Sequence, residues 1–199
     1  MKQPPKGLFF VGNDTEVGKT YVAALVAQAL RRQRLRVGVY KPVASGCELV
    51  NGSLHSEDAE RLWDAAGRVL DVGAVTPQCF AAPLAPPVAA RDEGRTVDSV
   101  LLRRGIEAWA EFDYGVVEGA GGLLSPISDS DLVADVAQDF NYPLVVVVNN
   151  GLGAINQTLL TLTAAQHYQL PVAGVVLNHL HPEAHASTQS NAREIARHT

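Results

Sequence analysis

The residues that most clearly indicate a chemical function lie in the segment 11–21, where Gly-Lys-Thr follows a glycine-containing turn. An apolar run at 8–11 predicts a buried strand before this segment, and the run at 22–27 predicts a helix after it. A helix N-terminus points backbone N–H groups at an anion, and the helix dipole favours negative charge there. The pattern therefore predicts a phosphate-binding loop, in which Lys19 reaches phosphate oxygens and Thr20 holds Mg²⁺ through its hydroxyl.

The spacing of this loop differs from the strict phosphate-loop pattern, because five residues separate Gly12 from Gly18 instead of four. The strict pattern would place glycine where the chain has Asn13. Asparagine tolerates a positive φ better than most residues, so a tight turn at Asn13 is compatible with the loop. The strand before the segment and the helix after it favour a phosphate loop over a Gly-Lys-Thr that merely begins a helix.

Two further residues are candidates for the same site. Lys41 follows a short apolar run at 37–40, and ligands of open α/β sheets bind at the carboxyl ends of strands. It is either a second lysine facing that site or an ordinary surface lysine before a turn. Asp58 lies in the first turn of a helix predicted over 56–66. It is either a metal ligand or an acid favoured there by the helix dipole.

A second nucleotide motif is predicted in the segment 114–122, which reads as a strand that ends in Glu118 and a glycine-rich run. An acid at such a strand end can hold a Mg²⁺–phosphate complex, and the glycines let the backbone approach phosphate closely. The alternative is a plain glycine-rich turn from a strand into a loop. The presence of the phosphate loop in the same chain favours the nucleotide motif.

The elements that position these residues alternate between strands and helices. Further predicted strands lie at 144–149 and 172–177, and further predicted helices begin near 152, over 97–109 with Trp109 in the core, and at 184–198. Asn51-Gly52-Ser53 predicts a turn, and the proline-containing apolar stretch within 67–95 predicts an ordered loop. We expect residues 1–199 to form a single α/β domain with a parallel sheet and helices on both faces.

Composition excludes several classes of function. Apolar residues make up 47% and charged residues 19% of the chain, which is typical of a globular protein. The net charge of −5 argues against a nucleic-acid partner. No apolar run is long enough to span a membrane, so no membrane partner is expected. With no signal-peptide core before the first strand, we expect a cytoplasmic protein in which Cys47 and Cys79 are reduced thiols. His179, His181 and His185 fit no familiar zinc spacing and are interpreted as solvated loop residues.

Four stretches together resemble the motifs of the dethiobiotin synthase family: 12–20, Lys-Pro-Val-Ala-Ser-Gly at 41–46, 118–122 and 152–156. The longer phosphate loop is the family's own form, and the 41–46 motif is the most specific of the four. The resemblance extends over nearly the whole chain and implies a P-loop nucleotide-hydrolase-like fold and a homodimer. Family members usually continue into a further strand and a loop near the nucleotide base. The end at Thr199 therefore leads to the expectation of relaxed discrimination among ATP, CTP and GTP.

The resemblance implies ATP- and Mg²⁺-dependent ring closure of 7,8-diaminononanoate with CO₂ or bicarbonate, which gives dethiobiotin, ADP and phosphate. One amine forms a carbamate, the carbamate attacks the γ-phosphate to give a carbamic–phosphoric anhydride, and the second amine closes the ring. Such chemistry gathers negative charge, and phosphoryl transfer depends mostly on positioning and charge stabilisation. The resemblance assigns Lys19 to the phosphates and Lys41 to the carbamate as catalytic residues.

The resemblance also implies the binding residues. Thr20, Asp58 and Glu118 would hold Mg²⁺. The substrate would contact Ser45, Lys41, Gly121, Leu152 and Asn156, with 151–156 reaching the substrate of a partner subunit. ATP would contact Thr15, Glu16, Val17, Gly18, Lys19, Thr20, Tyr21, Asp58, Glu118, Gly119, Ala120, Gly121, Asn178 and His179, with Asn178 at the base.

Other classes of protein fit the sequence less well. A partitioning or regulatory ATPase carries an extra lysine at the start of its phosphate loop, where this chain has Asn13 and Asp14. A GTPase requires an Asn-Lys-x-Asp motif for its base, and the sequence contains none. A nucleotide-binding scaffold without activity is disfavoured because every proposed catalytic residue is present.

Overall fold

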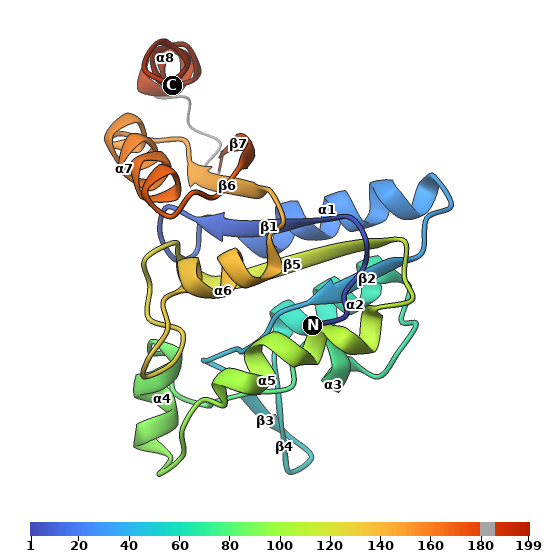
Figure 1. Ribbon diagram of the computed structural model, residues 1–199. Coiled ribbons are helices and arrows are strands. Elements are labelled where there is room, and N and C mark those ends of the chain that lie inside the picture. Colours follow the sequence, from blue (N-terminus) through green and yellow to red (C-terminus); the bar gives the residue numbers. More distant parts are fainter. Residues whose placement is uncertain (180–185) are drawn as a thin grey trace.

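The computed structural model describes residues 1–179 and 186–199, and its centre is a five-stranded sheet (Figure 1). The strand order is β2-β5-β1-β6-β7, and every neighbouring pair is parallel. The strands are β1 (Gly7–Gly12), β2 (Val37–Tyr40), β5 (Tyr114–Gly122), β6 (Leu144–Asn149) and β7 (Val172–Asn178). The predicted parallel sheet is confirmed, and its central strand β1 leads directly into the phosphate loop.

Helices cover both faces of this sheet, as predicted, with α1 and α2 on one face and α5 and α6 on the other (Figure 1). The helices are α1 (Lys19–Arg32), α2 (Glu57–Ala66), α3 (Val72–Val75), α4 (Pro86–Asp92), α5 (Ser99–Arg104), the 3-10 helix η1 (Gly105–Trp109), α6 (Val133–Phe140), α7 (Ala154–His167) and α8 (Ala186–Arg197). Over 1–179 and 186–199, none of them has the length and apolar character that crossing a membrane requires.

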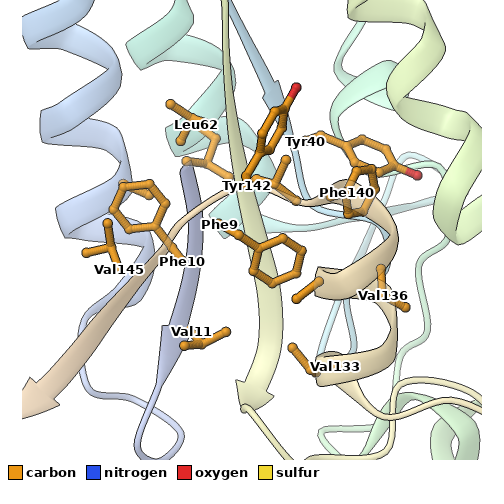
Figure 2. Packing of buried hydrophobic residues seen from close by; sticks show 14 of the residues in the cluster. Phe9, Phe10, Val11, Tyr40, Leu62, Val133, Val136, Phe140, Tyr142 and Val145 are labelled. Carbon is orange, nitrogen blue, oxygen red and sulfur yellow. The ribbon is translucent and has the colours of Figure 1, made fainter. Parts of the chain in front are cut away.

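The core holds β1 in place from both sides, because successive side chains of a strand point to opposite faces. Phe9 points toward α6, where its ring lies 5.9 Å from the ring of Phe140, and Phe10 points to the other face, near Leu62 of α2 (Figure 2). All three phenylalanine side chains and Leu62 are fully buried. The strand that carries the phosphate loop is therefore fixed by packing on both faces.

The helix predicted after Ser56 and the core position predicted for Trp109 are confirmed, whereas the helix predicted over 97–109 divides into α5 and the 3-10 helix η1. The helix α2 spans Glu57–Ala66, and the hydroxyl of Ser56 accepts a hydrogen bond from the backbone N–H of Ala59 at 3.3 Å, so Ser56 is its N-cap. Trp109 ends the η1 segment with no exposed surface, and its indole N–H donates to the carbonyl of Ala74 at 3.1 Å. The buried indole is thereby paired, as an aromatic N–H in a core should be.

The segments between the main elements contain more regular structure than the sequence predicted. The predicted turn at 51–53 is the tip of a hairpin between β3 (Glu48–Val50) and β4 (Ser53–His55). Asn51 and Gly52 both have positive φ, which suits the twist of a tight hairpin. The stretch 67–95, predicted as irregular, contains α3 and α4. Pro86 and Pro87 occupy the first turn of α4, where a missing N–H costs nothing. The helix α6 falls in a stretch for which the sequence predicted no element.

Candidate active site

The predicted phosphate loop connects β1 to α1, and its left-handed residues are Glu16 at φ 55° and Gly18 at φ 86°. Asn13 is not among the residues of positive φ, so the left-handed conformation that asparagine would tolerate there is not adopted. The left-handed positions of the loop therefore lie at its end, next to the helix. Gly12 is required for space, because an added Cβ would overlap the carbonyl oxygen of Asp14 and lie 3.1 Å from the Nζ of Lys19.

Side chains from the far half of the chain hold this loop in place. The amide nitrogen of Asn13 donates to Gln157 Oε1 of α7 at 2.7 Å, and the amide nitrogen of Asn178 at the end of β7 donates to the carbonyl of Val17 at 2.9 Å. Asn178 thus lies beside the phosphate loop, and its role at the nucleotide base stays a prediction. Gln157 was missed, because its partner is 144 positions away and no local pattern marks the pair.

Beneath the loop, Lys41 lies between two carboxylates. Its Nζ is 2.5 Å from Asp58 Oδ2 and 2.7 Å from Glu118 Oε1, and the residue is only 6% exposed. The hydroxyl of Thr20 donates to the same Glu118 oxygen at 2.9 Å. The structure therefore brings four predicted site residues together from α1, β5, the end of β2 and the start of α2. Lys41 is not a surface lysine, and Asp58 faces the cluster.

Burial and neighbouring charges shift the pKa values of Lys41, Lys19 and Asp58. Burial lowers the pKa of Lys41, but the charges of Glu118 and Asp58 outweigh burial, so that the pKa is raised overall. For Lys19, burial is the larger effect and the pKa is lowered. Burial raises the pKa of Asp58, yet the charge and hydrogen bond of Lys41 bring it below its usual value. At neutral pH Lys41 is therefore an ammonium group and Asp58 a carboxylate.

One oxygen of the cluster lacks a partner. Glu118 is 1% exposed, and its Oε2 is buried without a hydrogen bond from any described residue. A buried carboxylate oxygen of this kind is costly unless something else satisfies it. Oxygen ligands suit Mg²⁺, which usually takes one or two carboxylates together with waters and phosphate oxygens. The donor set of Thr20, Asp58 and Glu118 fits the predicted Mg²⁺ site, although the metal itself stays a prediction.

The remaining nucleotide residues lie along the loop and along β5. Val17 is buried, whereas Thr15, Glu16 and Tyr21 are exposed on the loop and the first turn of α1. The glycine-rich run Gly119, Ala120 and Gly121 belongs to β5, and Gly122 of this strand pairs with Gly12 of β1. A Cβ at Gly119 would lie 2.7 Å from Val133 Cγ1 of α6. The run therefore lies next to the phosphate loop and lets the α6 segment approach the strand.

The predicted substrate residues divide into two groups. Ser45 is half-buried in the segment that begins with Lys41, so it belongs to the same end of the sheet as the cluster. Leu152, which is 96% exposed, and Asn156 project from the surface at the start of α7. The structure does not bring these two to the cluster within this chain. Their predicted role toward a partner subunit stays a prediction.

His179 is less isolated than the sequence suggested. Its Nε2 lies 3.2 Å from the amide nitrogen of Asn150, and the oxygen of that amide accepts a hydrogen bond from Asn191 of α8 at 2.8 Å. Asn150 and Asn191 are both buried and were missed, although an asparagine directly after a buried strand is a signal for such a network. His181 and His185 lie outside the described residues.

Comparison with known proteins finds a matching family model and several relatives of this chain. A family model described as an AAA domain matches residues 6–199. The ATP-dependent dethiobiotin synthetase BioD of Rhodopirellula baltica is 45% identical over 203 residues, covering 96% of this chain and 79% of that protein. The enzyme of the same name from Anaeromyxobacter dehalogenans is 45% identical and covers 98% and 86%. BioD 1 of Escherichia coli O157:H7 is 39% identical and covers 89% and 79%.

Solved structures support the fold alone, because they are distant in sequence. The kinase domain of the Escherichia coli tyrosine kinase ETK matches with a TM-score of 0.55 at 17% identity, covering 94% of this chain and 72% of that one. The BceF tyrosine kinase domain matches with a TM-score of 0.51 at 13% identity, covering 88% and 69%. The P-loop fold is thereby confirmed, and the sequence relatives place the chain more narrowly: it belongs to the ATP-dependent dethiobiotin synthetase family.

Proposed function

We propose that this chain catalyses the ATP-dependent ring closure of 7,8-diaminononanoate with CO₂ or bicarbonate to dethiobiotin, with residues 1–199 acting as one domain. Membership of the family supports the use of ATP and the place in biotin synthesis. The observation that carries the proposal is the cluster of the buried Lys41, Glu118 and Thr20 with the half-buried Asp58, which includes the second residue of the helix that follows the phosphate loop. A site of this composition suits the transfer of a phosphoryl group to an anionic acceptor.

The two lysines stabilise negative charges on different groups in the reaction. A substrate amine takes up CO₂ as a carbamate, and the carbamate oxygen attacks the γ-phosphorus while ADP leaves. The second amine then attacks the carbamate carbon, and phosphate leaves as the cyclic urea closes. Lys19, at the first position of α1, faces the phosphates together with the backbone N–H groups of the loop. Lys41, kept protonated by its carboxylate neighbours, offers positive charge to the carbamate and the transferring phosphoryl group.

Thr20, Asp58 and Glu118 would hold Mg²⁺ in this proposal. When bound, the ion supplies charge neutralisation on the phosphate oxygens. The buried Glu118 oxygen that has no partner among the described residues supports this assignment. The protein's own part includes keeping Asp58 ionised, and Lys41 does so by lowering the pKa of that carboxyl group.

The proposal includes a homodimer. Leu152 and Asn156 are exposed at the start of α7, and an almost fully exposed leucine on a surface turn is suited to contact with another molecule. Gln157 joins the same turn to the phosphate loop through Asn13. A substrate bound near one loop would then also contact the 151–156 segment of the partner subunit.

Phosphate release tests the proposed reaction. It should require ATP, Mg²⁺, 7,8-diaminononanoate and CO₂ or bicarbonate together, and dethiobiotin should appear in equal amount. The Lys19→Ala protein, prepared identically, controls for a contaminating ATPase. An ATPase rate that is the same with and without the diamine would contradict the assignment and favour a regulatory ATPase.

A further inference from the structure

The segment 44–47, which carries Ser45 and Cys47, is joined by backbone hydrogen bonds to the segment 78–82, which carries Cys79. Ala44 and Cys79 form a parallel bridge, and the backbone N–H of Cys47 donates to the carbonyl of Phe80 at 3.0 Å. Three more backbone bonds complete the junction: Ala44 N–H to Gln78 O at 2.9 Å, Phe80 N–H to Ala44 O at 2.9 Å, and Gly46 N–H to Ala82 O at 3.0 Å. The junction places the only two cysteines of the chain next to one another.

The side chain of Cys47 reaches the backbone next to Cys79. The thiol of Cys47 donates to the carbonyl of Ala44 at 3.6 Å, and the backbone N–H of Phe80, the residue after Cys79, donates to the same oxygen at 2.9 Å. Interaction with the Cys79 thiol lowers the pKa of Cys47, and the charge of Lys41 lowers it further. The same interaction, together with burial, raises the pKa of Cys79. Cys47 is buried and Cys79 is half-buried, so Cys79 is the more exposed of the two thiols.

We propose that Cys47 and Cys79 form a modification site, a thiol pair that a peroxide converts into a disulfide, and that this modification weakens substrate binding at Ser45. The first part stands on the junction and the thiol contact. The second part rests on the proposed function, because it takes Ser45 to be a substrate residue.

The chemistry balances with the peroxide as the oxidant. The Cys47 thiolate attacks one peroxide oxygen, the O–O bond breaks, and the departing hydroxide takes up a proton to leave as water. The resulting sulfenic acid of Cys47 is attacked by the sulfur of Cys79, the S–O bond breaks, and the Cys79 proton leaves with the hydroxide as a second water. Two thiols are oxidised to one disulfide while one hydrogen peroxide is reduced to two waters. Both segments are already held together by backbone bonds, so little movement of the chain is needed.

The consequence for the site follows from one hydrogen bond. The Cys47 thiol closes the turn 44–47 by donating to Ala44, and Ser45 lies inside that turn. A disulfide sulfur has no hydrogen to donate, so oxidation removes this bond and relaxes the turn. Gly46, at φ 71°, lets the backbone of the turn adjust. Lys41 and the phosphate loop are held by other contacts, and the nucleotide site should not change.

The modification itself is tested by mass spectrometry of the full chain after hydrogen peroxide treatment and quenching. We expect a mass lower by two hydrogens, the loss of both titratable thiols, and a crosslinked peptide pair containing Cys47 and Cys79 that dithiothreitol separates. Cys79→Ser and Cys47→Ser are the matched controls, and neither should show the crosslink. A wild-type protein that forms only sulfenic or sulfinic acid, or only crosslinks between molecules, would overturn the proposal.

The effect on the site is tested by steady-state kinetics on oxidised and re-reduced protein. Oxidation should raise KM for the diamine severalfold, leave KM for ATP within twofold, and be reversed by dithiothreitol. Cys79→Ser keeps Cys47 but cannot form the disulfide, and a sulfenic acid at Cys47 still has an O–H to donate, so the KM of this variant for the diamine should not rise after peroxide treatment. An oxidised protein with unchanged KM for the diamine would overturn the second part. If the reduced protein makes no dethiobiotin, the proposed function fails instead, and the mass measurement still decides the modification site.

Discussion

At the scale of single residues, the two lysines of the site are held in different ways. Both lysines are almost fully buried, but Lys41 contacts two carboxylates, whereas Lys19 donates to one backbone carbonyl, that of Asp14 at 3.2 Å. Removing Lys41 would leave buried negative charge unpaired, which is one of the more costly changes a core can undergo. The more lightly held Lys19 can instead follow a phosphate. The structure thus distinguishes a lysine held between two carboxylates from one held by a single backbone carbonyl.

Replacing each lysine should separate these roles. Lys19→Ala should weaken ATP binding and turnover together. Lys41→Met, which nearly preserves side-chain volume, should leave ATP binding largely intact. It should raise the activation free energy of the chemical step by about 2–4 kcal/mol, which is comparable to the loss of one oxyanion donor. Isothermal titration with ATP and single-turnover assays measure the two effects. Normal turnover by a folded Lys41→Met protein would remove Lys41 from the mechanism.

A second residue-scale prediction concerns the metal. Asp58→Asn keeps the shape of the side chain but removes its charge, so the Mg²⁺ concentration for half-maximal activity should rise. Glu57→Gln is the matched control, because Glu57 is the neighbouring acid on α2, is exposed, and pairs with Arg61 instead of the cluster. Equal Mg²⁺ titrations for Asp58→Asn and the wild type would place Asp58 outside the metal site.

At the scale of elements, α5 and α6 are joined by a network of charged side chains outside the site. Arg103 of α5 lies 2.8 Å from Asp131 Oδ1 and 2.6 Å from Asp139 Oδ2 of α6. The hydroxyl of Ser128 also donates to Asp131 at 2.5 Å. The hydrogen bond from Arg103, with smaller contributions from Ser128 and Ser99, holds the pKa of Asp131 well below its usual value. The network fixes the connection from β5 to α6, which covers the glycine run of the site.

The pH dependence of unfolding tests this network. A carboxylate whose folded pKa is depressed adds stability that is fully present above its unfolded pKa of about 4 and is lost as the pH falls toward the folded value. Asp131→Asn should therefore lower the free energy of unfolding by about 1–3 kcal/mol at pH 7. Between pH ~5 and ~3, the free energy of unfolding should also fall less steeply for this variant than for the wild type. Urea unfolding at several pH values measures both.

Asp129→Asn is the control for this experiment, because Asp129 pairs with Arg91 on the surface. Exposed ion pairs contribute about 0–1 kcal/mol, so this variant should follow the wild type. If Asp131→Asn follows the wild type as closely, the network adds no stability to the connection.

At the scale of the whole molecule, the parallel sheet brings the candidate residues to the edge formed by the carboxyl ends of its strands. The phosphate loop follows β1, Lys41 follows β2, Glu118 lies on β5 and Asn178 ends β7. The carboxyl ends of parallel strands lie on the same side, so residues from the whole length of the chain meet there. The 151–156 segment follows β6 at this edge and presents Leu152 to solvent. A second subunit docked on this edge would therefore lie near the site.

The proposed homodimer is tested at Leu152. A charge at the centre of an interface opposes its burial, so Leu152→Asp should shift sedimentation from dimer toward monomer and raise KM for the diamine. Val69→Asp is the matched control, since Val69 is an exposed apolar residue elsewhere on the surface. A wild-type protein that sediments as a monomer would refute the dimer. A Leu152→Asp protein that stays dimeric would show that the interface lies on another face.

The sequence by itself determined the elements and the motifs, because these depend on local chemistry. Apolar runs of strand length predicted β1, β6 and β7, and the Gly-Lys-Thr between a strand and a helix predicted the phosphate loop. Ser56 marked the start of α2 through its capping hydroxyl. The hairpin β3–β4 and the helix α4 were missed, since short elements rich in turn residues and proline have weak periodicity.

Only the tertiary structure decided which side chains meet. Lys41 could have been a surface lysine until β2 and β5 paired and placed it beside Glu118, 77 positions along the chain. The bond from Asn178 to Val17 spans 161 positions, and the contact of Cys47 with Cys79 depends on the backbone junction between their segments. A sequence pattern reports the preference of a few neighbouring residues. Contacts between distant residues depend on strand order and register, which come from packing the whole core.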